Sequence, residues 1–169
     1  MPRKADLSKT DLPEPSVEDV LDAKGTLDAP STVLTAAPSD SVYDCIGRMV
    51  EQEIGSLVVV ENDEIAGIFT ERDYMRKVEL EGRRSQETPV RVVMTENVET
   101  VTPDRSLDDC VDLMQSLRCR HLPVVDAEGR LSDMISMRDC MQQLTETAKS
   151  KALQLIGRMQ EKYPVPMHG

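Results

Sequence analysis

Two short segments carry the same kinds of polar side chain at the same spacing. Thr70–Asp73 reads Thr-Glu-Arg-Asp, and Ser136–Asp139 reads Ser-Met-Arg-Asp, 66 residues further along the chain. A hydroxyl followed three residues later by a carboxylate is the pattern of a helix capping box, in which each side chain bonds the other residue's backbone N–H group. At a helix start the same groups can bind a nucleotide, because free N–H groups attract phosphate and a carboxylate accepts hydrogen bonds from ribose hydroxyls.

Cationic side chains favour the ligand-binding interpretation. Arg72 and Arg138 fill the third position of the two segments, which a cap does not require. A second basic segment, Arg118–His121, comes directly before an apolar run and ends in Arg120 and His121. Arginine gives charge-assisted, bidentate contacts to phosphate, and adenine needs only an apolar slot and a few backbone partners. The alternative for His121 is a surface histidine beside a strand.

An internal repeat contains both segments. Pro38–Met49 matches Pro103–Met114 at an offset of 65 residues, and Val58–Asp73 matches Val124–Asp139 at an offset of 66. The change of offset predicts one inserted residue between Met114 and Val124. Each half also begins with a short segment of spaced apolar residues. Self-similarity at a fixed spacing indicates a duplicated structural unit.

The same order of elements is predicted for both halves. A short extended segment (33–35 or 98–101) precedes a helix near Pro38 or Pro103, then come two β-rich runs joined by a turn and a closing helix. This is an α/β (α+β) fold of two β-α-β-β-α repeats. We expect them to pack sheet to sheet with pseudo-two-fold symmetry, because one repeat alone would expose much of its apolar sheet.

The boundaries follow from the repeat. We expect residues 1–15 to form a flexible tail, 16–83 the first repeat, 84–89 a linker, 90–145 the second repeat, and 146–169 a C-terminal helix and tail. The closing helix of the second repeat is predicted to run on, with an apolar stripe from Met141 to Met159. That stripe is interpreted as packing within the protomer or a dimer, with capture of a partner as the alternative.

Composition limits the classes of function. The chain has 169 residues and a net charge of −11, with one Phe, three Tyr and no Trp. General nucleic-acid binders present basic faces and aromatic platforms, so nucleic acid is not an expected partner. No apolar run reaches the roughly 18 residues that a membrane span needs. A soluble protein is therefore predicted.

The cysteines indicate a reducing environment. The four cysteines include no CxxC pair and no zinc-ligand spacing, so buried reduced thiols are predicted and no metal site is expected. A redox or metal role is the alternative. The predicted location is intracellular, either cytoplasmic or, after removal of a presequence, mitochondrial or plastid.

The motifs are similar to those of a known family. They are the strand Leu122–Val125, which reads LPVV, its counterpart LVVV in the first half, Gly67–Asp73, which reads GIFTERD, and Ser136–Asp139. The connection from Thr70 to Thr95, which reads TERDYMRKVELEGRRSQETPVRVVMT, adds to the likeness. Residues 16–145 resemble tandem cystathionine-β-synthase (CBS) domains, also called Bateman modules. The resemblance is to small stand-alone CBS-pair proteins of bacteria and plant organelles.

This resemblance implies adenine-nucleotide binding in clefts between the repeats. The two aspartates would bind ribose, the two hydroxyl residues would face phosphate, and backbone groups of the strands would contact adenine. The implied nucleotide-binding residues are Thr70, Arg72, Asp73, Ser136, Arg138, Asp139, Arg120 and His121, together with Leu34, Thr35, Ser56, Leu57, Thr100, Val101, Leu122 and Pro123.

The sequence departs from the family pattern at two places. Asp133 stands in the second repeat where the first has Gly67, and Leu57 is assigned to the position of the usual proline. Asp133 adds negative charge and bulk beside the second cleft, although an orientation toward solvent is the alternative. We therefore expect the two clefts to bind unequally.

The predicted function is a non-catalytic regulatory module. It would bind AMP, ADP, ATP, NAD or S-adenosylmethionine as a ligand, with no obligatory cofactor, and form a homodimer that modulates a partner protein. Thioredoxin is one partner that the plant relatives imply. The alternative is a scaffold or redox-partner regulator with weak or no nucleotide binding. An enzyme is not expected, because only His121 and His168 are present and no paired acid and base is visible.

Overall fold

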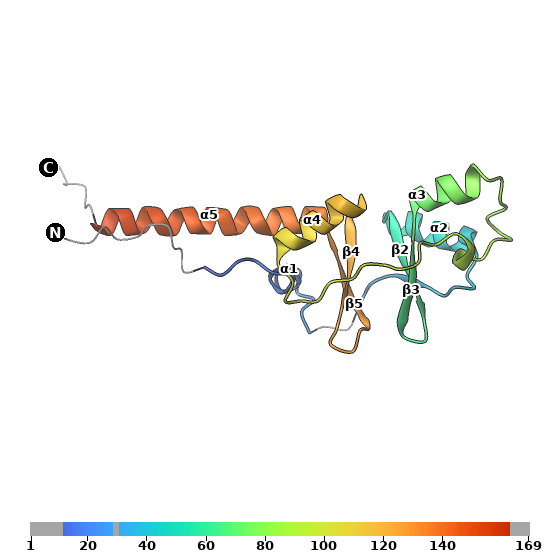
Figure 1. The fold of residues 1–169 in the computed structure, drawn as a ribbon, viewed down its shortest axis with the longest axis horizontal. Coiled ribbons are helices and arrows are strands. Elements are labelled where there is room, and N and C mark those ends of the chain that lie inside the picture. Colours follow the sequence, from blue (N-terminus) through green and yellow to red (C-terminus); the bar gives the residue numbers. More distant parts are fainter. Residues whose placement is uncertain (1–11, 29–30, 163–169) are drawn as a thin grey trace.

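Two units of similar architecture lie side by side. The computed structural model describes residues 12–28 and 31–162, so most of the predicted N-terminal tail and the end of the chain fall outside it. Each unit has a small sheet with helices on its outer face, and the last helix extends far beyond the second unit (Figure 1). None of the helices described is both long and apolar enough to cross a bilayer.

The first unit contains a three-stranded sheet. Its strands are β1 (Thr35–Ala36), β2 (Ser56–Glu61) and β3 (Glu64–Thr70), in the order β1-β2-β3. Strand β1 runs parallel to β2, and β2 is antiparallel to β3. The helices of this unit are α2 (Val42–Glu51), the single turn α3 (Glu71–Asp73), the π-helix η1 (Tyr74–Glu79) that continues it, and the 3-10 turn η2 (Val90–Val92).

The second unit repeats this plan with one strand reduced. Strands β4 (His121–Val125) and β5 (Leu131–Ser136) form an antiparallel pair. The predicted extended segment at 98–101 contributes only an isolated parallel bridge between Val101 and Val124. Its helices are α1 (Val17–Lys24), α4 (Leu107–Leu117) and α5 (Met137–Lys162). The β-α-β-β-α order predicted from the repeat is confirmed, with this one shortening.

The strand register corrects the alignment of the repeats. Val58 pairs with Ile68 in the first hairpin, and Pro123 pairs with Met134 in the second. Val58, and not Leu57 as expected from the sequence, therefore corresponds to Pro123 at an offset of 65, and the offset changes to 66 only after the hairpin turn. The extra residue lies in that turn and not between Met114 and Val124. The prediction failed because a run of similar valines aligns equally well in either register.

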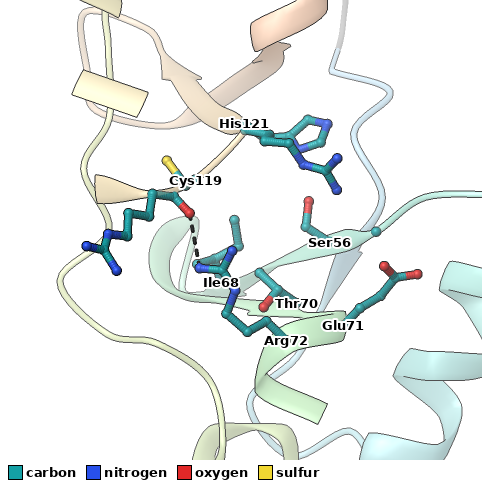
Figure 2. Close-up of a pocket in the computed structure, with 10 residues that line it drawn as sticks. Ser56, Ile68, Thr70, Glu71, Arg72, Cys119 and His121 are labelled. Atoms are coloured by element: carbon teal, nitrogen blue, oxygen red, sulfur yellow. Dashed lines mark hydrogen bonds between the residues drawn. The ribbon is translucent and has the colours of Figure 1, made fainter. Parts of the chain in front are cut away.

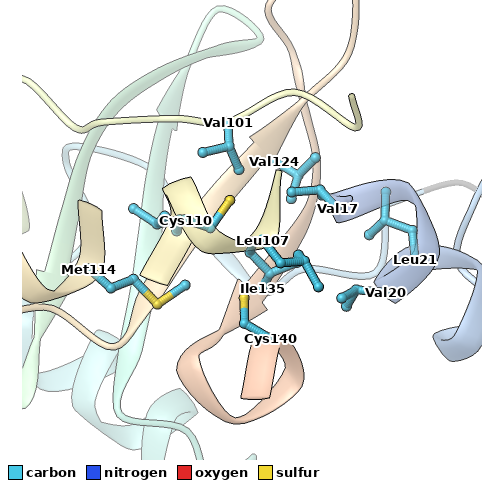
Figure 3. Packing of buried hydrophobic residues seen from close by; sticks show 11 residues of the cluster. Val17, Val20, Leu21, Val101, Leu107, Cys110, Met114, Val124, Ile135 and Cys140 are labelled. Carbon is cyan, nitrogen blue, oxygen red and sulfur yellow. The ribbon is translucent and has the colours of Figure 1, made fainter. Parts of the chain in front are cut away.

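Each core is closed by a segment from outside its own hairpin. Val17, Val20 and Leu21 of α1 are buried in the second core, where Figure 3 shows them beside residues of α4, β5 and α5. Val90 and Val93 are buried in the first core. The two units are therefore crossed: the segment that begins each predicted repeat packs against the other one.

Backbone hydrogen bonds hold these crossed segments in place. The N–H of Val17 donates to the carbonyl O of Arg105 at 2.9 Å. In the equivalent contact of the first unit, the N–H of Val90 donates to the carbonyl O of Asp40 at 2.8 Å. Since both bonds join a crossed segment to the region before a helix, the two units share one pseudo-symmetric plan.

The inner faces of the two sheets point toward each other. Val58 and Pro123 are buried, although neither belongs to the core beneath its own helices. Ser56 Oγ of β2 lies 3.9 Å from Met134 Sδ of β5, which places the two inner faces in contact. The sheet-to-sheet packing expected from the repeat is confirmed.

One capping device starts five helices. The sequence has Ser or Thr, followed three residues later by Asp, at Ser16, Ser41, Thr70, Ser106 and Ser136. At Ser41 and Ser106 the hydroxyl accepts the N–H of the aspartate, at 3.1 and 3.2 Å. An N-cap of this kind contributes about 1 kcal/mol to stability. A carboxylate three residues after a hydroxyl is therefore not by itself a sign of a ligand site here.

The last helix is longer than the core requires. Leu144 of α5 packs against the second core, but Met141 and Met159 are 50% and 53% exposed. Leu153 and Ile156 are also exposed. The predicted apolar stripe is thus covered within the protomer only in part.

Gly67 is required where the linker crosses β3. A Cβ built there would lie 2.6 Å from Met94 Sδ and 2.9 Å from the carbonyl O of Thr95. Thr95 cannot move away easily, because its N–H donates to the carbonyl O of Ile68 at 2.8 Å. In the second repeat, Lys24 and Thr26 bond the carboxylate of Asp133 at the equivalent position.

We predict that Gly67→Ala lowers the free energy of unfolding by about 1–3 kcal/mol, because the added methyl overpacks this crossing. The measurement is equilibrium unfolding in urea. Gly47→Ala is the matched control, since Gly47 lies in α2 with no atom within 4 Å of its built Cβ. That control should be unchanged or more stable by up to about 1 kcal/mol, because alanine favours helix. Equal stability of the parent and Gly67→Ala would contradict the prediction.

Candidate functional site

A cleft opens between the two units. It has a volume of about 200 Å³ and is lined by Gly55, Ser56, Ile68, Thr70, Glu71, Arg72, Arg118, Cys119, Arg120 and His121 (Figure 2). Five of the residues predicted from the sequence meet there: Ser56, Thr70, Arg72, Arg120 and His121. We call this the first cleft.

Four backbone elements place these side chains. Strand β2 begins at Ser56 and β3 ends at Thr70, so that neighbouring strand ends form one wall. The opposite wall is the turn between α4 and β4. Arg118 ends α4 in the left-handed conformation, with φ of 53°, and this reverses the chain direction so that the following residues enter β4. Each unit therefore contributes one wall.

One hydrogen bond spans the first cleft. Arg72 Nη1 donates to the carbonyl O of Arg118 at 3.1 Å, joining the two units (Figure 2). Arg72, Arg118 and Arg120 outnumber the single acidic side chain, Glu71. The cleft is therefore locally positive in a protein of net charge −11, which favours an anionic ligand.

His121 is held in its neutral form. Burial and the nearby Arg120 lower its pKa, and the attraction of Asp139 opposes them only in part. A neutral imidazole beside the arginines can donate or accept a hydrogen bond. An arriving anion would favour protonation of the ring, which would add a further positive charge to the cleft.

The first duplicated segment is a complete capping box. The hydroxyl of Thr70 accepts the N–H of Asp73 at 3.1 Å, and Asp73 Oδ2 accepts the N–H of Thr70 at 3.0 Å. Asp73 is 8% exposed and does not line the first cleft. The structural interpretation of this pair is confirmed. Its role in binding ribose stays a prediction.

The second duplicated segment is also a cap. Asp139 Oδ2 accepts the N–H of Ser136 at 2.8 Å, and the hydroxyl of Ser136 accepts the N–H of Asp139 at 3.1 Å. Asp139 lines a pocket of only about 100 Å³ together with residues of α1, among them Val20 and Lys24. Arg138 is exposed on α5 and lines neither that pocket nor the first cleft. The two duplicated segments thus face different surroundings.

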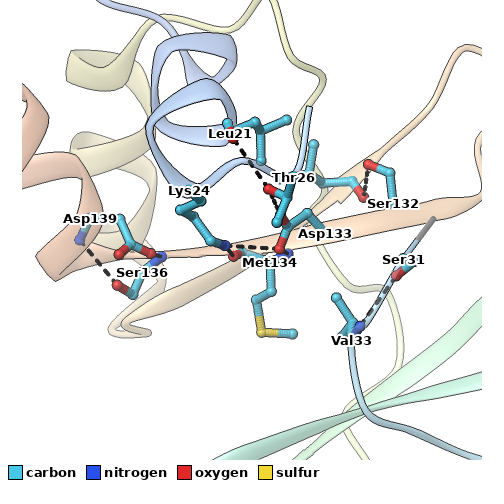
Figure 4. A network of polar contacts seen from close by, with 11 residues as sticks. Leu21, Lys24, Thr26, Ser31, Val33, Ser132, Asp133, Met134, Ser136 and Asp139 are labelled. Atoms are coloured by element: carbon cyan, nitrogen blue, oxygen red, sulfur yellow. Dashed lines mark hydrogen bonds and ion pairs between the residues drawn. The ribbon is translucent and has the colours of Figure 1, made fainter. Parts of the chain in front are cut away.

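Asp133 is not directed to solvent. Its carboxylate accepts hydrogen bonds from Lys24 Nζ, at 2.9 Å, and from the hydroxyl of Thr26 (Figure 4). Lys24 Nζ also donates to the carbonyl O of Met134 at 2.9 Å. Burial raises the pKa of Asp133, but the hydrogen bonds from Thr26 and Lys24 outweigh it, so the pKa lies below its ordinary value. The negative charge expected beside the second cleft is thus neutralised by an ion pair with Lys24.

The predicted adenine-contacting residues lie away from the first cleft, except Ser56. Leu57, Val101 and Leu122 point into the cores, so only their backbone groups could meet a ligand. Leu34, Thr35, Thr100 and Pro123 also do not line this cleft. All seven stay predictions.

Several lining residues were not assigned to the site from the sequence. Glu71 lies between the assigned residues Thr70 and Arg72, and Cys119 directly precedes the assigned Arg120, so continuity along the chain was the available signal. Gly55 and Ile68 carry no polar side chain and could be found only from the fold. Arg118 was noted as part of a basic segment, and the reversal of the chain at this residue brings it to the cleft.

The cysteines are reduced in this structure. Burial raises the pKa of Cys110 to about 11 and that of Cys140 to about 12, so both thiols stay protonated at neutral pH. Cys45 is likewise buried, whereas Cys119 is half-buried. Within residues 12–28 and 31–162, no group of His, Cys, Asp and Glu side chains is arranged to hold a metal ion.

Comparison with known proteins identifies the family. The CBS domain matches residues 28–80 and 90–146. This chain belongs to the CBS domain family. A CBS domain-containing mitochondrial protein of Arabidopsis thaliana, CBSX3, is 35% identical over 153 residues, which are 88% of this chain and 73% of that protein. The resemblance seen in the motifs is thereby confirmed.

Solved structures of CBS-domain proteins share the fold. One from Burkholderia ambifaria is 45% identical, with a TM-score of 0.71, covering 77% of this chain and 93% of that one. One from Agrobacterium tumefaciens is 35% identical, with a TM-score of 0.67, covering 76% and 98%. The CBS domain pair of the protein MJ0100, solved with 5′-methylthioadenosine and S-adenosyl-L-methionine, is 22% identical, with a TM-score of 0.62, covering 80% and 99%.

The ion pair between Lys24 and Asp133 leads to a prediction about how stability depends on pH. Because the folded pKa of Asp133 lies below its unfolded value of about 3.9, this carboxylate stabilises the fold above roughly pH 4, and the contribution is lost as pH falls through the folded pKa. Lys24→Ala should therefore cost about 1 kcal/mol at pH 7 and less at pH 3, measured by urea unfolding.

The matched control is Arg84→Ala, which removes an exposed ion pair with Glu87. It should change stability by no more than a few tenths of a kcal/mol at pH 7, because both partners are solvated. A stability loss in Lys24→Ala that is the same at pH 7 and pH 3 would show that Asp133 does not depend on Lys24 for its ionisation.

Proposed function

We propose that this protein is a regulatory CBS-pair module that binds an adenine nucleotide of the AMP or ATP type and modulates a partner protein. The observation that carries the proposal is the positive cleft between the two units, with Arg72 from one wall and Arg118 and Arg120 from the other. No residue is assigned a catalytic role.

The chemistry of the first cleft supports a phosphate-bearing ligand. Arginine guanidinium groups match phosphate oxygens bidentately, and three arginines are among the residues that line this cleft. MJ0100, solved with two adenosine-containing ligands, supports the view that this fold can hold adenosine. S-adenosylmethionine carries a positive sulfonium, which three arginines disfavour. ADP and ATP therefore fit this cleft best, NAD is intermediate, and S-adenosylmethionine fits it least.

The position of the cleft supports a regulatory role. A ligand held by both walls binds differently to two arrangements of the units, which is the condition for shifting a conformational equilibrium. Arg72 already bonds the backbone of Arg118 across the gap. If a ligand phosphate accepted the hydrogen bond from Arg72 instead, the direct contact between the two units would be replaced by a contact through the ligand.

The second candidate is a scaffold or redox-partner regulator without nucleotide binding. The capping boxes favour it, since Asp73 and Asp139 have a structural reason to be present without any ligand. Cys119, half-buried in the first cleft, is the thiol that a redox interpretation would use. Titration with nucleotides separates the two candidates.

We predict saturable binding of ATP in calorimetric titrations, with AMP and NAD weaker and S-adenosylmethionine weakest. Arg72→Ala and Arg120→Ala should each weaken ATP binding roughly tenfold or more, because each removes a charge-assisted hydrogen bond. The matched control is Arg138→Ala, which removes the equivalent arginine of the second repeat from an exposed site outside the first cleft. No heat with any of the four ligands would favour the scaffold.

We also propose that the protein forms a homodimer through the helices of the first unit. A groove of about 340 Å³ lies between α2 and η1 and is lined largely by apolar side chains, including Ile46, Val50, Tyr74 and Met75. Val50 and Met75 are 72% and 58% exposed in the protomer. An apolar surface of this kind is typical of a self-association site.

We predict that Val50→Glu shifts the protein toward monomer in sedimentation velocity, because a charge in the groove would have to be buried on association. Leu80→Glu is the matched control. Leu80 is 80% exposed but lies outside the groove, so its variant should sediment like the parent. A parent that is monomeric at all concentrations would refute the dimer.

A further inference from the structure

The last helix has one face that the described part of the chain leaves largely uncovered. Leu144 is the last apolar residue of α5 that packs on the second core, yet the helix runs on to Lys162 (Figure 1). Residues 12–15 lie on a different side of α5, where Lys151 pairs with Glu14 at 3.3 Å. Leu155 is half-buried and the rest of the uncovered face is exposed; the face consists of Met141, Thr145, Ala148, Ala152, Leu155 and Met159.

The spacing of this face is that of a coiled-coil seam. In a coiled coil, seam residues recur alternately every three and four residues, and each inserts between four residues of the facing helix. A hollow of about 340 Å³ on α5 has the required lining. It is formed by residues at the positions i, i+3, i+4 and i+7, followed by one further turn of the helix: Arg138, Met141, Gln142 and Thr145, then Glu146 and Lys149.

The face is nearly symmetrical about its middle. Its outermost residues, Met141 and Met159, lie nine residues before and nine residues after Ser150. The inner pairs, at five and two residues from the same point, are Thr145 with Leu155 and Ala148 with Ala152. An antiparallel second copy centred at this point would place each residue of the face opposite its counterpart. The surface is therefore self-complementary, as a two-fold contact requires.

Charge favours the same partner. After Ala148, α5 carries four basic residues and one acidic residue: Lys149, Lys151, Arg158 and Lys162, with Glu161. Helices α1 and α4 pack against the first part of α5 through the second core. Each of them exposes three acidic side chains: Glu18, Asp19 and Asp22 on α1, and Asp108, Asp109 and Asp112 on α4. An antiparallel pair brings the basic end of each α5 to the acidic unit of the other copy.

We propose that α5 is a self-association surface, on which a second copy of this chain lays its own α5 antiparallel, with Met141 opposite Met159 and the two alanines at the two-fold axis. Most helical stability comes from packing an apolar face, so this contact also accounts for a helix that continues beyond the core. It is separate from the groove between α2 and η1, which lies on the first unit. A protein with both contacts assembles beyond a dimer.

Paired cysteines test the antiparallel orientation. The background is Cys119→Ser, which removes the half-buried native thiol. In Met141→Cys/Met159→Cys, oxidation should give a covalent dimer, because each new thiol faces the other one of the second copy. The two positions lie about 27 Å apart along one helix, so they cannot bond within a chain.

The matched control is Met141→Cys/Leu153→Cys. Leu153 is 69% exposed but lies on another side of α5, so this variant should stay largely uncross-linked. The single variants Met141→Cys and Met159→Cys should also stay uncross-linked, because equal positions lie at opposite ends of an antiparallel pair. Absence of a covalent dimer in the double variant, or equal cross-linking in either single variant, overturns the proposal.

Sedimentation velocity separates the two contacts. Val50→Glu removes the groove contact and should leave a pair joined by α5. Adding Ala152→Glu should raise the dissociation constant of that pair roughly tenfold or more, because its centre would bury a charge. Gln154→Glu is the matched control, since it places the same charge on an exposed side of α5 outside the face.

The outcomes for the two contacts are distinguishable. If Val50→Glu is monomeric and the cysteine pair does not cross-link, the α5 contact fails while the groove dimer stands. If Val50→Glu sediments like the parent and Ala152→Glu dissociates it, the groove dimer fails while the α5 contact stands. A parent that is monomeric at all concentrations refutes both.

Discussion

Neither half of this protein closes its own hydrophobic core. Val17, Val20 and Leu21 precede the first hairpin but are buried in the second core, and Val90 and Val93 are buried in the first. Exposing such residues costs about 1.5–3 kcal/mol each, so separating the units would uncover a large part of each core. This crossing keeps the two sheets face to face, and the cleft between them exists only because they stay so.

Capping explains more of the sequence than ligand binding does. Five helices begin with the same spacing of hydroxyl and carboxylate, and only two of these belong to the duplicated segments. The bond network therefore uses each aspartate for structure first. The two duplicated segments differ in their charged partners. Asp73 forms an ion pair with Lys77, whereas the residue at the equivalent position of the second repeat is the uncharged Gln143. Duplication thus preserved the cap but not the electrostatics around it.

The charge of the whole protein and the charge of the cleft have opposite signs. A net charge of −11 repels anions at long range, but screening limits that effect to roughly 8 Å at physiological ionic strength. Inside the cleft, three arginines outnumber Glu71. A short-range site for a phosphate group is therefore compatible with an acidic protein, and the acidic surface lowers the chance of nonspecific binding to nucleic acid.

The amino-acid sequence by itself determined the duplication, the order of elements and half of the residues that line one cleft. Periodic apolar residues and repeated motifs carry that information locally, so the family resemblance and the meeting of Thr70, Arg72, Arg120 and His121 could be foreseen. It could not determine the strand register, because adjacent valines align equally well one residue apart.

Only the tertiary structure decided three features: the crossing of the initial segments, the pairing of Asp133 with Lys24, and the contacts of Asp73 with Lys77 and Thr95. The crossing and the Asp133 pair join residues far apart in the chain. The Asp73 contacts depend on a π-helical turn and on a linker passing over Gly67. Hydrogen bonds act over about 3 Å, so whether a polar group is free or committed depends on packing that no sequence spacing specifies.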